Sequence, residues 1–251
     1  MKINFQLDTY AIHTRLAPSL FVLLPLALSA VAYFPSLTAG FRSLWVLAAT
    51  CGGTFLLSEM GRDAGTKKQN ALFERWGGKP SVRLLRHNGA ANKVILADLH
   101  SKLRALIPTA SIPTEEGEDA DPQAADDVYE FCGRFLRTKT RADKRTFRLI
   151  HKENGSYGFR RNLWALKPLG ISTTAISIAL PLPLYWGAWH LPSPPEPLLL
   201  IVAEVINLVI LLVWTFWISP SWVKIPADAY AERLLEACDA LLPAQRSRRK
   251  L

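Results

Sequence analysis

A single carboxylic acid, Glu204, lies within a long apolar stretch and is the strongest candidate for chemistry in the sequence. A carboxylate in apolar surroundings is unfavourable unless it is protonated or hydrogen-bonded, and such residues often mark proton or ion pathways. Asn207 lies one helical turn away, and we expect Tyr185, Ser29 and Thr50 at a similar depth. One carboxylate without a second charge favours a structural role, in which hydrogen bonds join neighbouring helices.

Two short segments place an acid two residues from a histidine, which could form a general acid–base pair: Asp98 with His100, and His151 with Glu153. Neither pair has a catalytic motif around it. We therefore expect no catalytic residue, no cofactor and no enzymatic activity. The alternative is a membrane-anchored enzyme with an unrecognised site, for which His87, Asp98, His100 and His151 are the residues to test.

The cysteines and the acidic residues do not form a recognisable metal site. Cys51, Cys132 and Cys238 lie far apart, which excludes a disulfide framework or a zinc knuckle and fits a reducing compartment. The acidic segment 113–127 contains Gly117, but its spacing does not match a calcium-binding loop. We expect this segment to be a solvated flexible loop and the chain to hold no metal.

Four apolar stretches have about the length that a helix needs to cross a bilayer core of roughly 30 Å. They run from Pro18 to Phe34, Phe41 to Ser58, Leu169 to Trp189 and Leu198 to Ile218. Short links join the first to the second and the third to the fourth, and the second link contains four prolines. The fold class that we predict is all-α, with four transmembrane helices arranged as two hairpins and a mostly helical domain between them.

The distribution of Lys and Arg predicts how these helices are oriented. Between Met60 and Ala165 there are 20 basic and 13 acidic residues, the C-terminal end is basic, and the two links contain neither Lys nor Arg. Because basic segments stay in the cytosol, both termini and the middle domain are expected there, in a multi-pass protein of a bacterial inner membrane. Most of the net charge of +9 is then explained by the orientation of the helices in the membrane.

The alternative for the first stretch is a cleaved signal peptide, since residues 30–32 have the small-x-small form of a cleavage site. Asp8 and a 17-residue segment before the stretch are unusual for a signal peptide, and Pro25 interrupts the apolar run. The chain is therefore expected to divide into five parts. These are a cytosolic segment (1–17), a first hairpin (18–58), the cytosolic domain (59–168), a second hairpin (169–218) and a cytosolic amphipathic helix with a basic tail (219–251).

Apolar residues at helical spacing predict helices in the cytosolic parts. The predicted ranges are Thr66–Trp76, Asn92–Ile107, Pro122–Thr138 and Pro226–Leu242, and Gly155 is expected to break the pattern between 146–152 and 157–165. For the last helix, docking on the cytosolic domain is favoured over lying along the bilayer.

Two basic clusters flank the cytosolic domain next to the membrane. Basic and aromatic side chains at this level attract anionic lipid headgroups, which we expect to be their partners. The same holds for the basic run 134–148, so nucleic acid is not expected as a partner. The residues of the two clusters that we expect to contact lipid or a protein partner are Arg62, Lys67, Lys68, Arg160, Arg161 and Trp164.

The segments around these clusters resemble a family of uncharacterised bacterial membrane proteins. The resemblance is carried by Arg62-Asp-Ala-Gly-Thr-Lys-Lys68, by 72–80, by 84–87 and by Tyr157-Gly-Phe-Arg-Arg-Asn-Leu163. It implies no activity, cofactor or site residue.

The function that we predict is therefore non-enzymatic. The cytosolic domain would sense or bind a protein partner, and the membrane hairpins would transmit that event by self-association and perturbation of the bilayer. This arrangement is similar to that of small membrane effectors in bacterial phage-defence systems, although only at the level of architecture. The other alternative is a transporter or channel subunit that uses Glu204.

Overall fold

The computed structural model describes residues 12–33, 41–88, 92–185 and 196–248, except the side chains of 13, 41–50, 184, 185 and 243–248. Within these ranges every regular element is a helix, so the predicted all-α class is confirmed. The elements are η1 (Ile12–Leu16), α2 (Ala17–Tyr33), α3 (Phe41–Lys67), α4 (Gln69–Arg75), α5 (Pro80–Arg83), α6 (Lys93–Leu106), α7 (Glu115–Ala120), α8 (Pro122–Thr140), α9 (Arg148–Ala165), α10 (Lys167–Ala179), α11 (Leu182–Tyr185), α12 (Pro197–Leu212), η3 (Val213–Trp217) and α13 (Pro220–Arg248).

The chain divides into two compact units. Unit 1 comprises Met1–Gln69 and Gly158–Val223, and unit 2 comprises Asn70–Tyr157 and Lys224–Leu251. Helices α9 and α13 each contribute residues to both. Each unit has its own apolar core.

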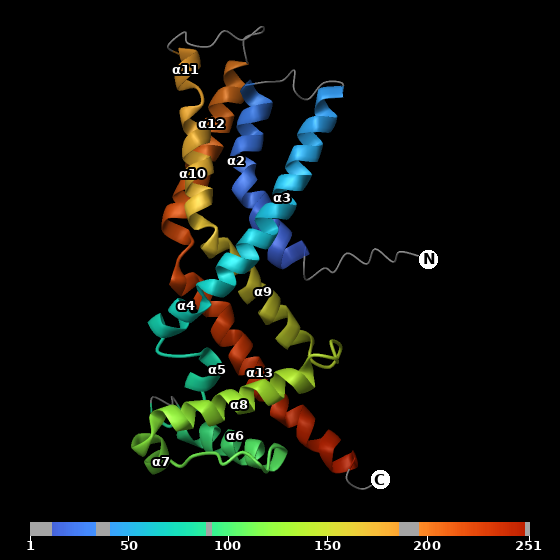
Figure 1. The fold of residues 1–251 in the computed structure, drawn as a ribbon, viewed down its shortest axis with the longest axis vertical. Coiled ribbons are helices and arrows are strands. Elements are labelled where there is room, and N and C mark those ends of the chain that lie inside the picture. The colour runs from blue at the N-terminus through green and yellow to red at the C-terminus, as the bar shows by residue number, and fades with distance from the viewer. Residues whose placement is uncertain (1–11, 34–40, 89–91, 186–195, 249–251) are drawn as a thin grey trace, which may run out of the picture. The chain divides into compact units, whose positions relative to one another are not determined.

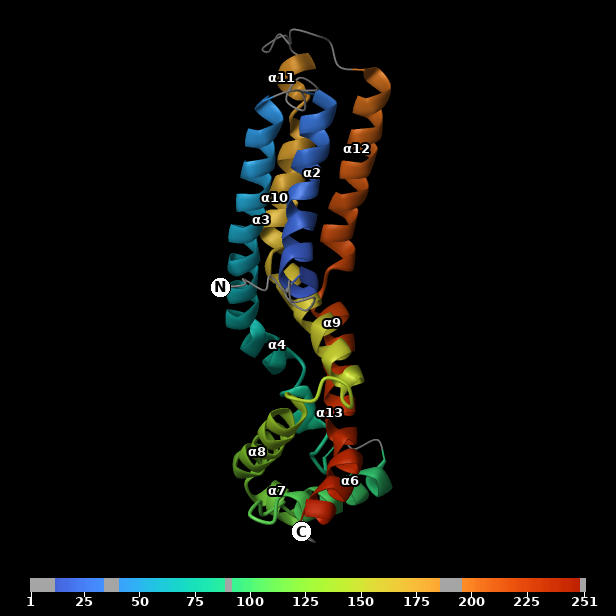
Figure 2. The same cartoon turned by 90° about the vertical axis from the view of Figure 1, so that its right-hand side faces the viewer.

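In unit 1, helix α2 packs against α3, α10 and α12, and α10 also packs against α12 (Figures 1 and 2). The ring of Trp214 is fully buried in this bundle and contacts Phe21, with the ring centroids 5.2 Å apart. Gly170 of α10 lies directly against the Trp214 ring, because a Cβ built on Gly170 would overlap it. The absence of a side chain at Gly170 therefore allows α10 to approach η3 closely.

Unit 1 differs from a water-soluble bundle in where its polar and apolar side chains lie, because polar side chains share the interior with the apolar core and large apolar ones are exposed. Its interior contains hydroxyl and amide side chains, whereas large apolar side chains cover the outside of α12 and η3; Phe216 of η3, for example, is 77% exposed. Hydroxyl groups in the interior bond to backbone carbonyls, as Thr173 does across the bundle to Val22 (2.9 Å). The buried polar residues of the described part of unit 1 are Thr14, Ser19, Ser29, Thr54, Ser58, Asn162, Thr174, Ser177 and Asn207. This distribution matches helices that pack in lipid through small and hydroxyl residues.

Two helical segments are long and apolar enough to cross a membrane, Thr14–Tyr33 and Pro197–Trp217. They coincide with the first and fourth predicted stretches. The third differs from the prediction, because α10 ends at Ala179 after 13 residues and a turn separates it from α11. Pro181 and Pro183 lack the N–H groups that would continue the helix, which explains the interruption. Helix α3 continues nine residues beyond the predicted end at Ser58, to Lys67.

Unit 2 is built around apolar residues from α6, α8 and α13 and from the segments between helices. Leu103, Tyr129, Leu136 and Leu234 are completely buried in this core. From Lys224 onward, α13 belongs to unit 2 and contributes Leu234 and its neighbours to the core. The apolar stripe of this helix therefore packs against the rest of unit 2, as predicted.

Two predictions about unit 2 are wrong. Helix α9 runs without interruption through Gly155, because Ile150 and Tyr157 are buried on either side of it and packing outweighs the roughly 1 kcal/mol that a glycine costs in a helix. The segment 113–127 is solvent-exposed over most of its length, as expected, but it is not a loop, since it forms α7 and the start of α8.

Local capping explains why this acidic segment is helical. The Thr114 hydroxyl accepts a hydrogen bond from the Gly117 N–H (3.2 Å), and the Asp121 carboxylate accepts one from the Ala124 N–H (3.0 Å). Acidic residues in the first turn of α7 also favour the helix through its dipole. The Gly77–Gly78 pair, by contrast, ends the preceding helical segment as predicted, with φ angles of 78° and 126°.

Candidate functional site

Two polar contacts join α2 to α12 within unit 1. The Tyr33 hydroxyl donates a hydrogen bond to the Glu204 carboxylate (2.8 Å), and the Asn207 amide donates one to the Ser29 hydroxyl (3.1 Å). Tyr33, Asn207 and Ser29 are buried, and Glu204 is partly buried. Because Ser29 and Tyr33 are four residues apart on α2, they present both groups to the same face of α12.

The predicted partners of Glu204 are only partly correct. Ser29 and Asn207 lie in the cluster, but they bond to each other, and Tyr33 is the partner that sequence reasoning missed. Tyr33 could have been found from the sequence, because it lies one helical turn from Ser29 and so faces the same neighbouring helix. The side chains of Tyr185 and Thr50 lie outside the described residues. As a hydrogen-bonded pair between two helices, Glu204 and Tyr33 match the structural interpretation of the carboxylate.

The two basic clusters of the sequence meet within unit 1. The Lys68 ammonium lies 5.6 Å from the centre of a Trp164 ring and donates to the Ala165 carbonyl (3.4 Å). The Arg160 guanidinium lies 4.6 Å from the centre of a Trp222 ring and donates to the backbone carbonyl of the same residue (2.9 Å). These contacts join the end of α3 to α9, and α9 to the start of α13.

Asn162 lies at the centre of this junction and is almost completely buried. Its amide donates to the Thr14 carbonyl (2.8 Å), and its carbonyl oxygen accepts from the Arg161 guanidinium, which also reaches Gln69 (2.6 Å). A Cβ on Gly65 would lie 2.5 Å from the Asn162 oxygen, so any larger residue there would require the hydrogen-bonded Asn162 amide to shift. Two of the segments that carry the family resemblance are therefore in direct contact.

The predicted lipid-contacting residues are thus largely engaged within the chain. Arg62 forms ion pairs with Glu59 (2.9 Å) and Asp63 (3.1 Å), and Lys67 is exposed. These contacts give the clusters a structural role, while binding of anionic lipid stays a prediction.

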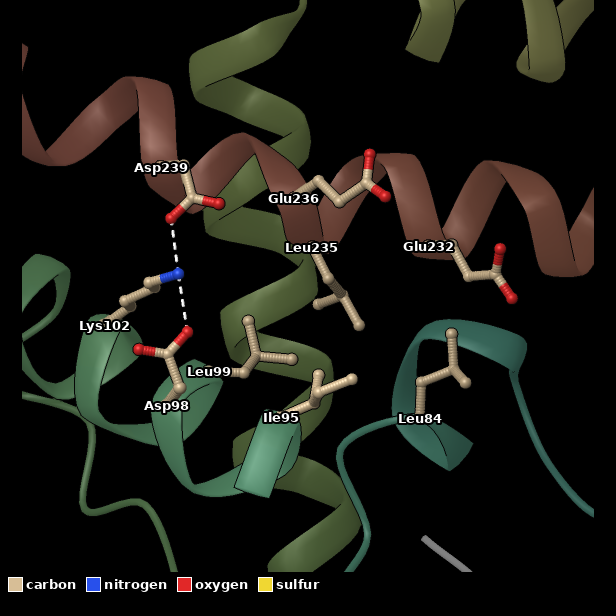
Figure 3. A pocket seen from close by; sticks show the side chains of 9 residues that line it. All are labelled: Leu84, Ile95, Asp98, Leu99, Lys102, Glu232, Leu235, Glu236 and Asp239. Carbon is tan, nitrogen blue, oxygen red and sulfur yellow. Dashed lines mark ion pairs between the residues drawn. The ribbon is translucent and has the colours of Figure 1, made fainter. Parts of the chain in front are cut away.

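A pocket of about 250 Å³ lies between α6, α13 and Leu84 within unit 2 (Figure 3). The apolar side chains Leu84, Ile95, Leu99 and Leu235 point toward one another at its centre. The Lys102 ammonium bridges two carboxylates at its edge, Asp98 (2.6 Å) and Asp239 (2.5 Å). Glu232 and Glu236 complete the lining. Four carboxylates and one ammonium therefore surround an apolar floor.

The carboxylate of Glu118 is the centre of a buried polar network in unit 2. It accepts hydrogen bonds from the Tyr129 hydroxyl (2.7 Å) and from the N–H groups of His87 (2.9 Å) and Asn88 (3.3 Å). Burial by itself would raise the pKa of Glu118, but these donors stabilise the anion and hold its pKa below the ordinary value. Glu118 therefore ties α7 to α8 and to the chain after α5.

The four residues proposed for an enzymatic site do not gather at one place. The rings of His87 and His100 are in edge-to-face contact at 4.8 Å, but His100 is buried and its Nε2 bonds to the Leu85 carbonyl (2.8 Å). Burial lowers the pKa of His100, so the ring is neutral at neutral pH. Asp98 belongs to the pocket, and His151 faces the Thr140 carbonyl (3.3 Å).

The described cysteines and acids form no metal-binding group. Among those residues no three His, Cys, Asp or Glu side chains gather closely enough to hold an ion. Cys51 is exposed, whereas Cys132 and Cys238 are buried in the core of unit 2. Burial raises the pKa of Cys132 to about 11 and that of Cys238 to about 12, so both are thiols at neutral pH.

The aromatic residues of the basic run 134–148 are occupied within unit 2. Phe147 belongs to the core, and Phe135 packs against it while the Lys139 ammonium lies 5.4 Å from its ring centre. Both rings therefore have a structural role in unit 2, while the absence of a nucleic-acid partner stays a prediction.

Comparison with known proteins gives no identification. No family model matches the chain, and neither the curated proteins nor the solved structures contain a significant match. The resemblance to uncharacterised membrane proteins stays a prediction from the motif segments alone.

Proposed function

We propose that the chain is a non-enzymatic, four-span protein of the bacterial inner membrane, in which unit 2 is cytosolic and binds a protein partner. The observation that carries this proposal is the exposed apolar surface of α12. Ile201, Val205 and Leu208, together with Phe216 of η3, are more than half exposed, while Ala203, Asn207 and Ile210 face inward. A core helix of a soluble protein buries its large apolar side chains instead, so lipid is the solvent that fits this surface.

The other two spans are proposed from their packing and surface. Helices α3 and α10 lie beside α2 and expose apolar side chains as α12 does, among them Phe55, Leu56 and Ile176. α10 alone rises only about 20 Å, so α11 and the segment after it would complete the crossing. The charge bias of the sequence supports cytosolic termini.

The role of unit 2 as a binding unit is supported by its pocket. Partner binding there would change self-association of the spans, and the assembled spans would perturb the bilayer, as in an effector of a defence system. Expression of the chain, alone or with its genomic neighbours, should therefore depolarise cells, and a membrane-potential dye measures this directly. Cells that keep their potential at high expression would exclude the membrane-perturbing role.

The same membrane-potential measurement, made on a Glu204 variant, tests the alternative that the chain is a transporter or channel subunit. Because the carboxylate is hydrogen-bonded to Tyr33, we expect Glu204→Gln to keep this interhelical contact and the depolarisation of the wild type. Loss of ion flux in a variant that still reaches the membrane would instead assign Glu204 to a conduction pathway.

A further inference from the structure

The pocket of unit 2 combines an apolar floor with an acidic edge. The edge carries the carboxylates of Asp98, Glu232, Glu236 and Asp239. The chain as a whole has a net charge of +9. An acidic surface on such a chain attracts cations and repels anionic lipid and nucleic acid. The class of ligand that fits both properties is a cation with an apolar part.

The floor of the pocket is open to large side chains. Ile95 is 63% exposed, and the preceding residue of α6, Val94, is 79% exposed. Exposed apolar residues beside a pocket favour a partner that removes them from water. A pocket of about 250 Å³ is smaller than most sites for organic ligands but accommodates one large apolar side chain from another protein.

Lys102 already shows how a cation is held at the edge. Its ammonium lies within 2.6 Å of the Asp98 and Asp239 carboxylates, and these groups come from two helices. Figure 3 shows this ammonium on one side of the apolar floor, with Glu232 and Glu236 farther along α13. Glu236 forms a surface ion pair with Arg233 (2.7 Å), and exposed pairs of this kind exchange partners at little energetic cost.

We propose that this pocket binds a basic amphipathic helix of a partner protein. One large apolar side chain of that helix would fill the floor between Ile95, Leu99 and Leu235. Lys or Arg side chains one turn before and after it would pair with the carboxylates at the edge. This inference rests on the proposed function, in which unit 2 is the partner-binding unit.

Anisotropy of a labelled peptide tests the inference on the full chain in nanodiscs of zwitterionic lipid. The probe is a helical peptide of Lys and Leu with one central Trp, and its counterpart has Glu in place of every Lys. Empty nanodiscs measure binding to lipid alone. We expect saturable binding of the basic peptide that weakens as salt is raised, and no binding of the acidic peptide.

Variants of the edge identify the site. The double variant Glu232→Lys and Glu236→Lys should weaken binding about tenfold, because two attractive contacts become repulsive. Glu74→Lys with Glu116→Lys makes the same charge change at exposed residues of unit 2 outside the pocket and should have little effect. Ile95→Ser should weaken binding without changing its salt dependence.

Lys102→Met provides the decisive variant. It removes the ammonium that competes for Asp98 and Asp239, so the basic peptide should bind about threefold more tightly. A merely structural role of Lys102 predicts equal or weaker binding.

Binding that is equal for both double variants would overturn the inference. A chain that reconstitutes in nanodiscs but binds neither peptide also overturns it, while a chain that cannot be reconstituted contradicts the proposed membrane protein. Tighter binding of a peptide of residues 242–251 would assign the pocket to a second copy instead.

Discussion

Replacing Gly170 by alanine is expected to destabilise unit 1 by about 2 kcal/mol, because a methyl group there overlaps the Trp214 ring. The ring cannot move away freely, since it is completely buried and in contact with Phe21. The gain in helix propensity from glycine to alanine, about 1 kcal/mol, offsets only part of this overpacking. The measurement is the midpoint of thermal unfolding in a mild detergent, followed by tryptophan fluorescence.

Gly52 provides the matched control for this prediction. It also lies in a helix of unit 1, but no atom is within 4 Å of a Cβ built on it. Gly52→Ala should therefore be neutral or slightly stabilising. The additional substitution Trp214→Leu should recover part of the stability lost in Gly170→Ala. If the two alanine variants unfold at the same temperature, the close packing of α10 on η3 is wrong.

The second large effect is expected for Glu118→Gln, which should destabilise unit 2 by about 2–3 kcal/mol. Three donors point at the carboxylate, and hydrogen bonds to a charged group contribute about 1.5–3 kcal/mol each. A glutamine side chain keeps one acceptor oxygen, but its NH₂ group replaces the second oxygen. That group is itself a donor and therefore faces N–H or O–H groups that have lost their acceptor. Glu116→Gln, an exposed position on the same helix, should be nearly neutral in chemical unfolding monitored by circular dichroism.

The pH dependence of stability gives an independent test of Glu118. Its pKa in the folded chain is below the ordinary carboxyl value of 4.5, so the unfolded chain binds this proton first as the pH falls. The contribution of Glu118 is therefore complete above about pH 4.5 and is lost as the pH falls through the folded pKa. The stability difference between wild type and Glu118→Gln should shrink in this range. A difference that stays constant down to pH 3 would contradict the assigned charge state.

Local patterns in the sequence predict most of the helices, but tertiary contacts decide where they end. The apolar stripe of α13 predicts a helix over Pro226–Leu242, and the structure extends it to Pro220–Arg248. The break expected at Gly155 is absent because the flanking residues are buried. At Pro181, by contrast, the missing N–H is a local property, so the interruption of the third apolar stretch was predictable from the residue type.

The sites depend on contacts between distant parts of the chain, which a single sequence does not contain. The pair Tyr33–Glu204 joins residues that are 171 positions apart. The pocket combines α6 with α13, although the spacing of Glu232, Glu236 and Asp239 on one helical face is a local signal for its acidic edge. Glu118 looks like one solvated acid among many in the sequence. Its burial depends on donors that lie about 30 residues earlier in the chain.

Site-directed labelling with a membrane-impermeant maleimide tests the central claim, that four spans place unit 2 in the cytosol. In a Cys51→Ser background, the buried Cys132 and Cys238 remain unreactive. Single cysteines are introduced at Ser36 and Ser193 in the two links and at Ser111 on the exposed surface of unit 2. We expect labelling at 36 and 193 in spheroplasts, and at 111 only after lysis. Labelling at 111 in intact spheroplasts, or protection of either link, would contradict it.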